Sequence, residues 1–180
     1  MLPSPQHPRI GLTGTTAFSP NGTLVAVADP VMYGLEEAAL VLFDVSDPRH
    51  PRHMSSVGRE DEKEVGFNRV AFHPEGNLVA AAGEDGTTWL WSVADRTKPH
   101  LAGQLARHPD TVDDVLFGPD GQTLVTSSGG IAYLWDLGDY PKIAADTIGM
   151  ACRITGGGLE DWEWQVHAPD VPFHPSCPSG

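Results

Sequence analysis

Four side chains near the C-terminus are of the types that bind zinc: Cys152, His167, His174 and Cys177. Thiolate and imidazole are ligands that zinc prefers, but the spacing of these four fits no standard zinc module. We therefore expect no metal and no cofactor, and we expect the two thiols to help hold the end of the chain together. A disulfide between them is disfavoured in a reducing cytosol.

Sequence signatures of common reactions are missing from the chain. The stretch "GGGLED" (156–161) is not followed by Gly-Lys-Ser/Thr, so it is not a P-loop. There is no Gly-x-Ser-x-Gly and no His-Glu-x-x-His. An enzyme would need clustered His, Asp, Glu or Arg, and only His108 with Asp113 and Asp114 approaches such a cluster. We therefore expect a protein that is not an enzyme.

Charge narrows the classes of partner. Eleven Lys and Arg oppose 24 Asp and Glu, giving a formal net charge of −13. This excess argues against nucleic acid, whose phosphates need cationic groups, and against an anionic membrane surface. A first acidic group stands in "GREDEKE" (58–64) and a second follows one repeat later: Glu60, Asp61, Glu62, and then Asp110, Asp113 and Asp114 in the corresponding loop. These residues form either a solvated loop or a patch that recognises a basic protein partner.

Nearly the same nine residues occur three times: "FSPNGTLVA" (18–26), "FHPEGNLVA" (72–80) and "FGPDGQTLV" (117–125). Phe18 and Phe72 are 54 positions apart, and Phe72 and Phe117 are 45 apart. The shorter period suits a unit of four short strands. The longer one exceeds it by nine residues, and this excess lies in "DPVMYGLEEA" (29–38), which forms either a plain loop or a flap that contacts a partner.

The second copy predicts the elements of one unit. Strands are expected at 69–72, 77–83 and 87–93, joined by turns at 74–76 and 84–86 where Pro and Gly favour reversals. An outer strand follows within 94–105. The strands are apolar on both faces, which indicates units that stack against each other around an axis.

The repeat endings "LFDV" (42–45), "LWSV" (90–93) and "LWDL" (134–137) resemble the Trp-Asp ending of WD repeats, and "RHPDTVDDVLFGPDG" (107–121) is similar to the opening of such a repeat. The resemblance implies an all-β fold, a partial β-propeller of about three four-stranded WD-repeat blades with a short helical C-terminal tail. It also implies a hydrogen-bonded set in each blade: His before the first strand, Ser or Thr on the second, Asp in the hairpin and Trp on the third. The matching positions here are Phe43, Asp44, Asp85, Trp91, His108, Ser127, Trp135 and Asp136. No copy contains the full set, so stability must depend on apolar packing.

The end of the chain (150–177) resembles a C-terminal segment of bacterial multi-repeat WD proteins. Those proteins often carry a sensor, a protease or a STAND-type NTPase region ahead of the repeats. Within this tail, 143–154 is predicted to be a helix and 159–167 a second, short one, whose acidic start suits the helix dipole.

The expected organisation is therefore an outer strand of an incomplete blade (1–12), three blades (13–57, 58–105 and 106–142) and the tail (143–180). A closed propeller needs about four to eight blades. We expect either the C-terminal piece of a longer regulatory protein that acts as an interaction scaffold or sensor module, or a subunit that completes a ring by oligomerisation. The chain has no apolar run long enough to cross a membrane and no signal peptide, so a cytoplasmic location is expected.

Overall fold

The computed structural model describes residues 14–28, 38–58, 66–105 and 108–146. Within these ranges the strands form three antiparallel sheets in chain order. Sheet 1 contains β1 (Thr15–Phe18), β2 (Leu24–Ala28), β3 (Ala38–Asp44) and β4 (Arg52–Gly58). Sheet 2 contains β5 (Phe67–Phe72), β6 (Leu78–Gly83), β7 (Thr88–Ser92) and β8 (His100–Leu105). Sheet 3 contains β9 (Val112–Phe117), β10 (Thr123–Ser128) and β11 (Ile131–Asp136).

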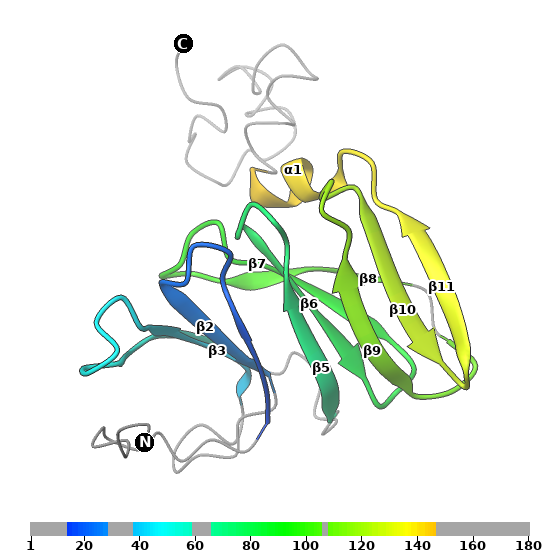
Figure 1. The fold of residues 1–180 in the computed structure, drawn as a ribbon, viewed down its shortest axis with the longest axis horizontal. Helices are drawn as coiled ribbons and strands as arrows, with labels where there is room; N and C mark the ends of the chain where they lie inside the picture. The colour runs from blue at the N-terminus through cyan, green and yellow to red at the C-terminus, as the bar shows by residue number, and fades with distance from the viewer. Residues whose placement is uncertain (1–13, 29–37, 59–65, 106–107, 147–180) are drawn as a thin grey trace, which may run out of the picture.

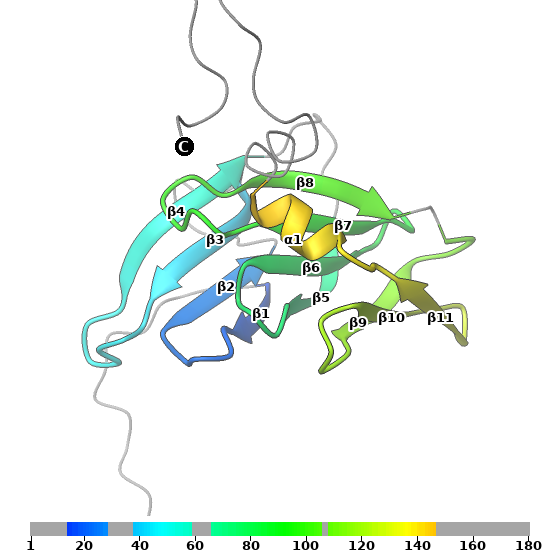
Figure 2. The ribbon, with the colours of Figure 1, turned by 90° about the horizontal axis from the view of Figure 1, so that it is seen from above.

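The three sheets are arranged like the ribs of a fan (Figure 1). Their first strands contact one another in order, β1 with β5 and β5 with β9. The last strands of sheets 1 and 2, β4 and β8, lie at the edges opposite these first strands, as the view from above shows (Figure 2). This arrangement confirms the all-β, partial propeller. One detail differs: in the described residues sheet 3 has three strands, where the repeat predicts four.

Two apolar clusters hold the fan together, one on each side of sheet 2. The first joins it to sheet 1 through residues such as Leu42, Val79 and Trp91. The second joins it to sheet 3 through residues such as Leu90 and Leu124. Every residue of β6 is buried, which confirms burial on both faces for this strand. Burial on both faces is wrong for β11, where four of the six residues are exposed, because no described element covers the outer face of sheet 3.

The thrice-repeated stretch forms the turn between the first two strands of each sheet, as predicted. In each copy the glycine N–H donates to the carbonyl three residues earlier, at 2.8 to 3.0 Å. The glycine has a positive φ near 70° in all three copies: Gly22, Gly76 and Gly121. A side chain is disfavoured at such a φ, so the repeated glycine has a conformational cause.

The start of the predicted helix over 143–154 is wrong, and the part of that range from 147 on lies outside the described residues. Helix α1 (Tyr140–Ala145) begins three residues earlier, with Pro141 in its first turn, where proline is well tolerated. The N–H of Asp146 at its C-cap donates to the Lys142 carbonyl. Buried Ala144 and half-buried Tyr140 pack against the cluster between sheets 2 and 3, so packing on β6 fixes the start of the helix.

Several expectations lie outside the described residues. They concern the N-terminal outer strand, most of the 29–38 insertion, Glu60, Asp61 and Glu62, and the tail with its two cysteines and two histidines.

Candidate protein-interaction surface

His108 connects sheets 2 and 3 at the end of the fan that carries the β6–β7 hairpin. Its backbone N–H donates to the Gly86 carbonyl of that hairpin at 2.6 Å, and its ring Nδ1 lies 3.2 Å from the same oxygen. Its Nε2 lies 2.8 Å from Thr126 Oγ1, which also accepts the Trp135 Nε1–H at 2.9 Å. If the His108 ring donates from Nδ1 and accepts the Thr126 hydroxyl proton at Nε2, each polar group in this hydrogen-bond network has a partner.

This chain of hydrogen bonds corrects one predicted position. The hydroxyl between His108 and Trp135 belongs to Thr126 and not to Ser127. Adjacent residues of a strand point to opposite faces, and Thr126 points toward sheet 2 while Ser127 lies on the other face. His108 precedes β9 and Trp135 lies on β11.

The other predicted repeat positions have different surroundings in sheets 1 and 2. In sheet 2 the Asp85 carboxylate accepts the Thr87 N–H at 2.9 Å, and the indole 3.5 Å away belongs to Trp89, not Trp91. Trp91 is buried instead, edge-on to Phe67. In sheet 1, Phe43 is buried and contacts His53 edge-on. The Asp136 carboxylate of sheet 3 accepts the Gly138 N–H at 3.0 Å.

Asp110, Asp113 and Asp114 are all exposed but do not share one loop as predicted. Asp110 lies in the loop before β9, whereas Asp113 and Asp114 lie on β9 itself. Asp114 is 3.3 Å from Arg69 Nε of β5, so its charge is partly neutralised by the neighbouring sheet. An exposed pair of this kind contributes little to stability.

The sequence predicts Asp85 only as a repeat position and does not place it, or Glu84, beside Asp110. Glu84 and Asp85 are exposed in the β6–β7 hairpin. The hairpin contacts the loop directly, because the Thr111 hydroxyl donates to the Glu84 carbonyl at 3.2 Å and Gly86 packs against the Asp110 carbonyl. We call Glu84, Asp85, Asp110 and Asp113 the acidic rim. The Asp-Gly pair predicted the hairpin correctly. The acidic rim could have been predicted from it if the loop before β9 had been placed beside the hairpin.

A second buried histidine was also missed. His73, the variable residue of "FHPEG", lies 2.9 Å through Nε2 from the Gly121 carbonyl of the equivalent turn in sheet 3, and its Nδ1 accepts the Glu75 N–H at 3.2 Å. A Cβ on Gly121 would meet the His73 ring at van der Waals overlap. Because successive strands alternate in direction, His73 and His108 fasten sheets 2 and 3 at opposite ends.

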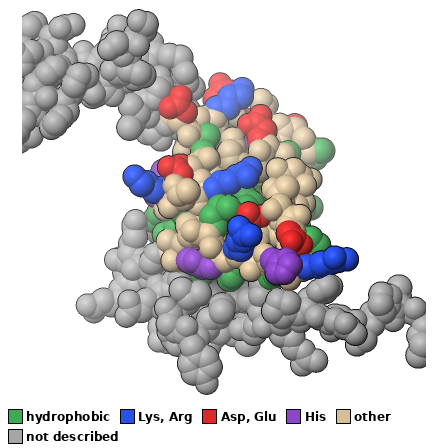
Figure 3. All heavy atoms as spheres, turned by 90° about the vertical axis from the view of Figure 1, so that its left-hand side faces the viewer, with side chains coloured by type: hydrophobic (Ala, Val, Ile, Leu, Met, Phe, Trp, Pro, Cys, Tyr) green, Lys and Arg blue, Asp and Glu red, His purple; other side chains and the backbone are tan. Residues whose placement is uncertain are grey.

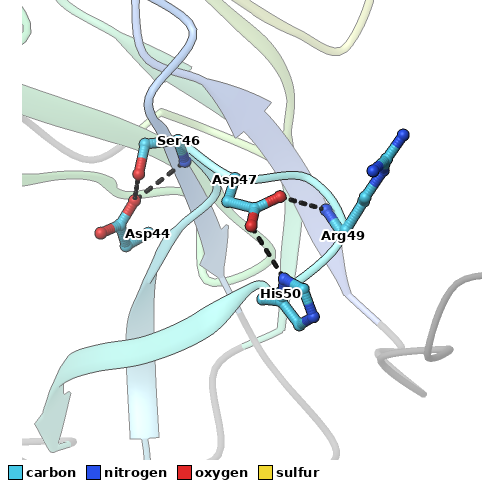
Figure 4. A network of polar contacts seen from close by, with 5 residues as sticks. All are labelled: Asp44, Ser46, Asp47, Arg49 and His50. Carbon is cyan, nitrogen blue, oxygen red and sulfur yellow. Dashed lines mark hydrogen bonds and ion pairs between the residues drawn. The ribbon is translucent and has the colours of Figure 1, made fainter.

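The turn between β3 and β4 is built from carboxylates that accept local hydrogen bonds (Figure 4). Asp44 accepts the Ser46 hydroxyl at 2.6 Å and its N–H at 2.9 Å, and Asp47 accepts His50 Nδ1 at 2.8 Å and the Arg49 N–H at 3.0 Å. The Ser46 hydroxyl lowers the pKa of Asp44 most, and the His50 ring lowers the pKa of Asp47 most. Acidic, basic and histidine side chains intermix on this side of the molecule, with scattered hydrophobic ones (Figure 3).

A shallow groove of about 430 Å³ runs across the three first strands. It is lined by Thr16–Phe18 and Pro20, by Arg69–Phe72 and by Asp114–Leu116. Its charged residues, Arg69 and Asp114, are paired with each other. Within the described ranges no three His, Cys, Asp or Glu side chains are grouped to hold a metal ion. No helix in those ranges has the length and apolarity needed to span a membrane.

Comparisons with known proteins agree with this geometry. Residues 59–92 and 100–136 match the WD40 family model, described as WD domain, G-beta repeat, so the resemblance is confirmed for the second and third copies. Over 117 residues the chain is 26% identical to Protein LST8 homolog of Drosophila melanogaster, a match that covers 62% of this chain and 36% of that protein. Over 105 residues it is 30% identical to Histone acetyltransferase type B subunit 2 of Candida glabrata, covering 57% of this chain and 23% of that protein. A third relative, WD repeat-containing protein 75 of Danio rerio, is 34% identical over 79 residues, covering 42% and 9%. The matches thus span little more than a third of these relatives at most.

Proposed function

We propose that this chain, whose second and third sheets carry WD40 repeats, is a non-enzymatic scaffold that binds other proteins. The observation that carries the proposal is how the polar side chains are divided. Among the buried polar side chains, His73, His108 and Thr126 hydrogen-bond to other parts of the protein, and two of these three bonds join sheet 2 to sheet 3. The buried hydroxyls of Thr88 and Ser92 in β7 have no hydrogen-bond partner among the described residues. The four carboxylates of the acidic rim are exposed instead, where they can meet a partner.

The acidic rim favours a basic partner protein. Its four carboxylates lie on the hairpin of one sheet and on the first strand and preceding loop of the next, so a partner docked there would span two sheets. Charges at such a position raise the association rate with an oppositely charged protein, and the effect falls with ionic strength.

We also propose, from the tail resemblance, that the scaffold belongs to a larger bacterial regulatory protein that works in the cytoplasm. The relatives reported above come from eukaryotes, so this context is supported by the tail alone. One of them is by its name a subunit of a histone acetyltransferase, which fits the general role of an assembly component.

The test is quantitative capture of partners on the full chain, with wild type, an Asp110→Lys/Asp113→Lys variant and a Glu75→Lys control. Glu75 is exposed at the opposite end of sheet 2, so the control tests for the effect of a charge reversal away from the rim. Partners that use the rim should be lost from the double variant by roughly tenfold and from wild type at high salt, but retained by the control. Partners that bind all three proteins equally would remove the rim from the proposal.

A second candidate function is a subunit that completes a ring with further copies of itself. Its support is the outer face of sheet 3, where Leu116 and Leu134 are exposed. Light scattering on purified protein tests it, because a monodisperse monomer of 19.3 kDa would exclude self-assembly.

A further inference from the structure

Among the described residues, strand β11 lies at a free edge of its sheet. Within the described residues it pairs with β10 alone, whereas the equivalent strands β3 and β7 each pair on both sides. Both ribbon views show nothing labelled beside its outer edge (Figures 1 and 2). Its central leucine, Leu134, is 75% exposed.

The pairing registers show which residues of β11 correspond to those of β3 and β7. In each sheet a phenylalanine of the first strand pairs with an apolar residue of the second, which pairs with an aromatic residue of the third. These rows are Phe18–Val25–Phe43, Phe72–Val79–Trp91 and Phe117–Leu124–Trp135. Leu134 therefore corresponds to Leu42 and Leu90, and Asp136 to Asp44 and Ser92.

The two existing outer strands follow a common pattern. Both run antiparallel to their neighbour, and both have a register shift at the same step, between Leu42 and Phe43 and between Leu90 and Trp91. Their sequences share a basic residue, two variable residues, a small residue, a polar residue and an apolar residue: Arg52–Val57 in β4 and His100–Leu105 in β8.

The free edge carries an acidic residue that would face the basic residue of this pattern. Arg52 lies opposite Asp44, and its charge is a minor cause of the lowered pKa of that carboxyl. In sheet 2 the corresponding His100 lies opposite Ser92. Asp136, in the same register position, is exposed and ends a strand that carries no other charge. A cationic side chain on an added strand would lie opposite it.

The edge also lacks the usual protection against strand addition. Free edges are normally blocked by lysines, prolines or bulges. The sequence of β11, "IAYLWD", contains no lysine and no proline, and its pairing with β10 is regular over all six residues.

We propose that the free edge of β11 binds an extended segment of a partner protein, added antiparallel in the register of β4 and β8, with a basic residue opposite Asp136. Main-chain hydrogen bonds supply affinity in such strand addition, and the side chains supply selectivity. The inference rests on the proposed scaffold function and assigns it a binding site separate from the acidic rim.

The test uses a labelled peptide with the chain's own outer-strand sequence, residues 50–58, "HPRHMSSVG". Binding to the full chain is followed by anisotropy, and its site by amide hydrogen exchange. We expect new protection at 131–136 and none at β3 or β7. A peptide N-methylated on alternate residues should not bind, because it cannot form the ladder.

A charge swap tests the register. Asp136→Lys should weaken binding of the wild-type peptide by about two- to fivefold, the range for an exposed ion pair. A peptide with Glu in place of Arg52 should restore the affinity for this variant. Glu75→Lys, the matched control, should bind both peptides as the wild-type protein does.

Two results would overturn the proposal. One is an absence of protection at 131–136 with peptide at about 1 mM, the weak end of specific binding. The other is a free protein in which β11 amides are already as protected as those of β7, because a segment of this chain or of a second copy would then occupy the edge. Partner capture at the acidic rim is measured separately, so failure of the peptide leaves the scaffold function standing.

Discussion

Sheets 2 and 3 carry a leucine at the same register position, and the two leucines have opposite surroundings. Leu90 is 1% exposed because sheet 3 covers it, whereas Leu134 is 75% exposed because no described element covers the outer face of sheet 3. Leu42 in sheet 1, covered by sheet 2, is 0% exposed. In a stack of repeats, the neighbour and not the residue type decides what a position contributes to stability.

Truncating Leu90 and Leu134 to alanine is the strongest test of this difference. Leu90→Ala should lower the free energy of unfolding by about 2–5 kcal/mol, since it removes a buried side chain and leaves a cavity. Leu134→Ala should change it by less than about 0.5 kcal/mol, as exposed substitutions usually do. Urea unfolding monitored by circular dichroism measures both. Equal losses would mean that the outer face of sheet 3 is covered in solution.

The two faces of sheet 3 can be compared through adjacent residues of one strand. Thr126→Val should cost about 1–3 kcal/mol, because it removes the hydroxyl between His108 and Trp135 and leaves both ring nitrogens short of a partner. Ser127→Ala, on the outer face, should cost less than about 0.5 kcal/mol.

Thr126→Ser is the matched control for that pair, since it keeps the hydroxyl and loses only a methyl group. It should retain more of the stability than the valine variant. If serine destabilises the protein and valine does not, packing of the threonine methyl explains its position and the hydrogen bonds do not.

Much of the fold could be predicted from the sequence because its signals are local. The glycine of each repeated turn needs a positive φ, so the turn chemistry at Gly22, Gly76 and Gly121 marks the period and with it the blades. The apolar run of β6 likewise indicates burial on both faces.

The misplaced features depend on information that is not local. Which of two adjacent hydroxyls meets His108 depends on the phase of β10, and its pairing with β9 is irregular at Ser127 and Ser128. The role of His73 requires the turns of two sheets to be side by side. The start of α1 depends on packing against β6, which a sequence window does not contain.

The smallest expected effect is a loss of stability at low pH. It allows a turn of sheet 2 to be compared with a turn of sheet 3. Asp95 after β7 and Asp120 before β10 each accept a threonine hydroxyl, which is the largest cause of their lowered pKa. A carboxyl whose pKa falls on folding stabilises the fold above its unfolded pKa, near the ordinary 3.8, and loses that contribution as pH falls through the folded value. Stability measured by urea unfolding should therefore decline as the pH falls below about 5.

Asparagine variants assign that decline to each sheet. Asp95→Asn and Asp120→Asn should each make the decline shallower, because the amide cannot titrate. Asp120 also accepts backbone N–H groups from both Gln122 and Thr123, so its variant should flatten the curve slightly more. If Asp120→Asn left the pH dependence of the unfolding free energy unchanged, the β9–β10 turn of sheet 3 would contribute no acid-sensitive stability. Sheets 2 and 3 would then differ in their turns as well as in whether another sheet covers them.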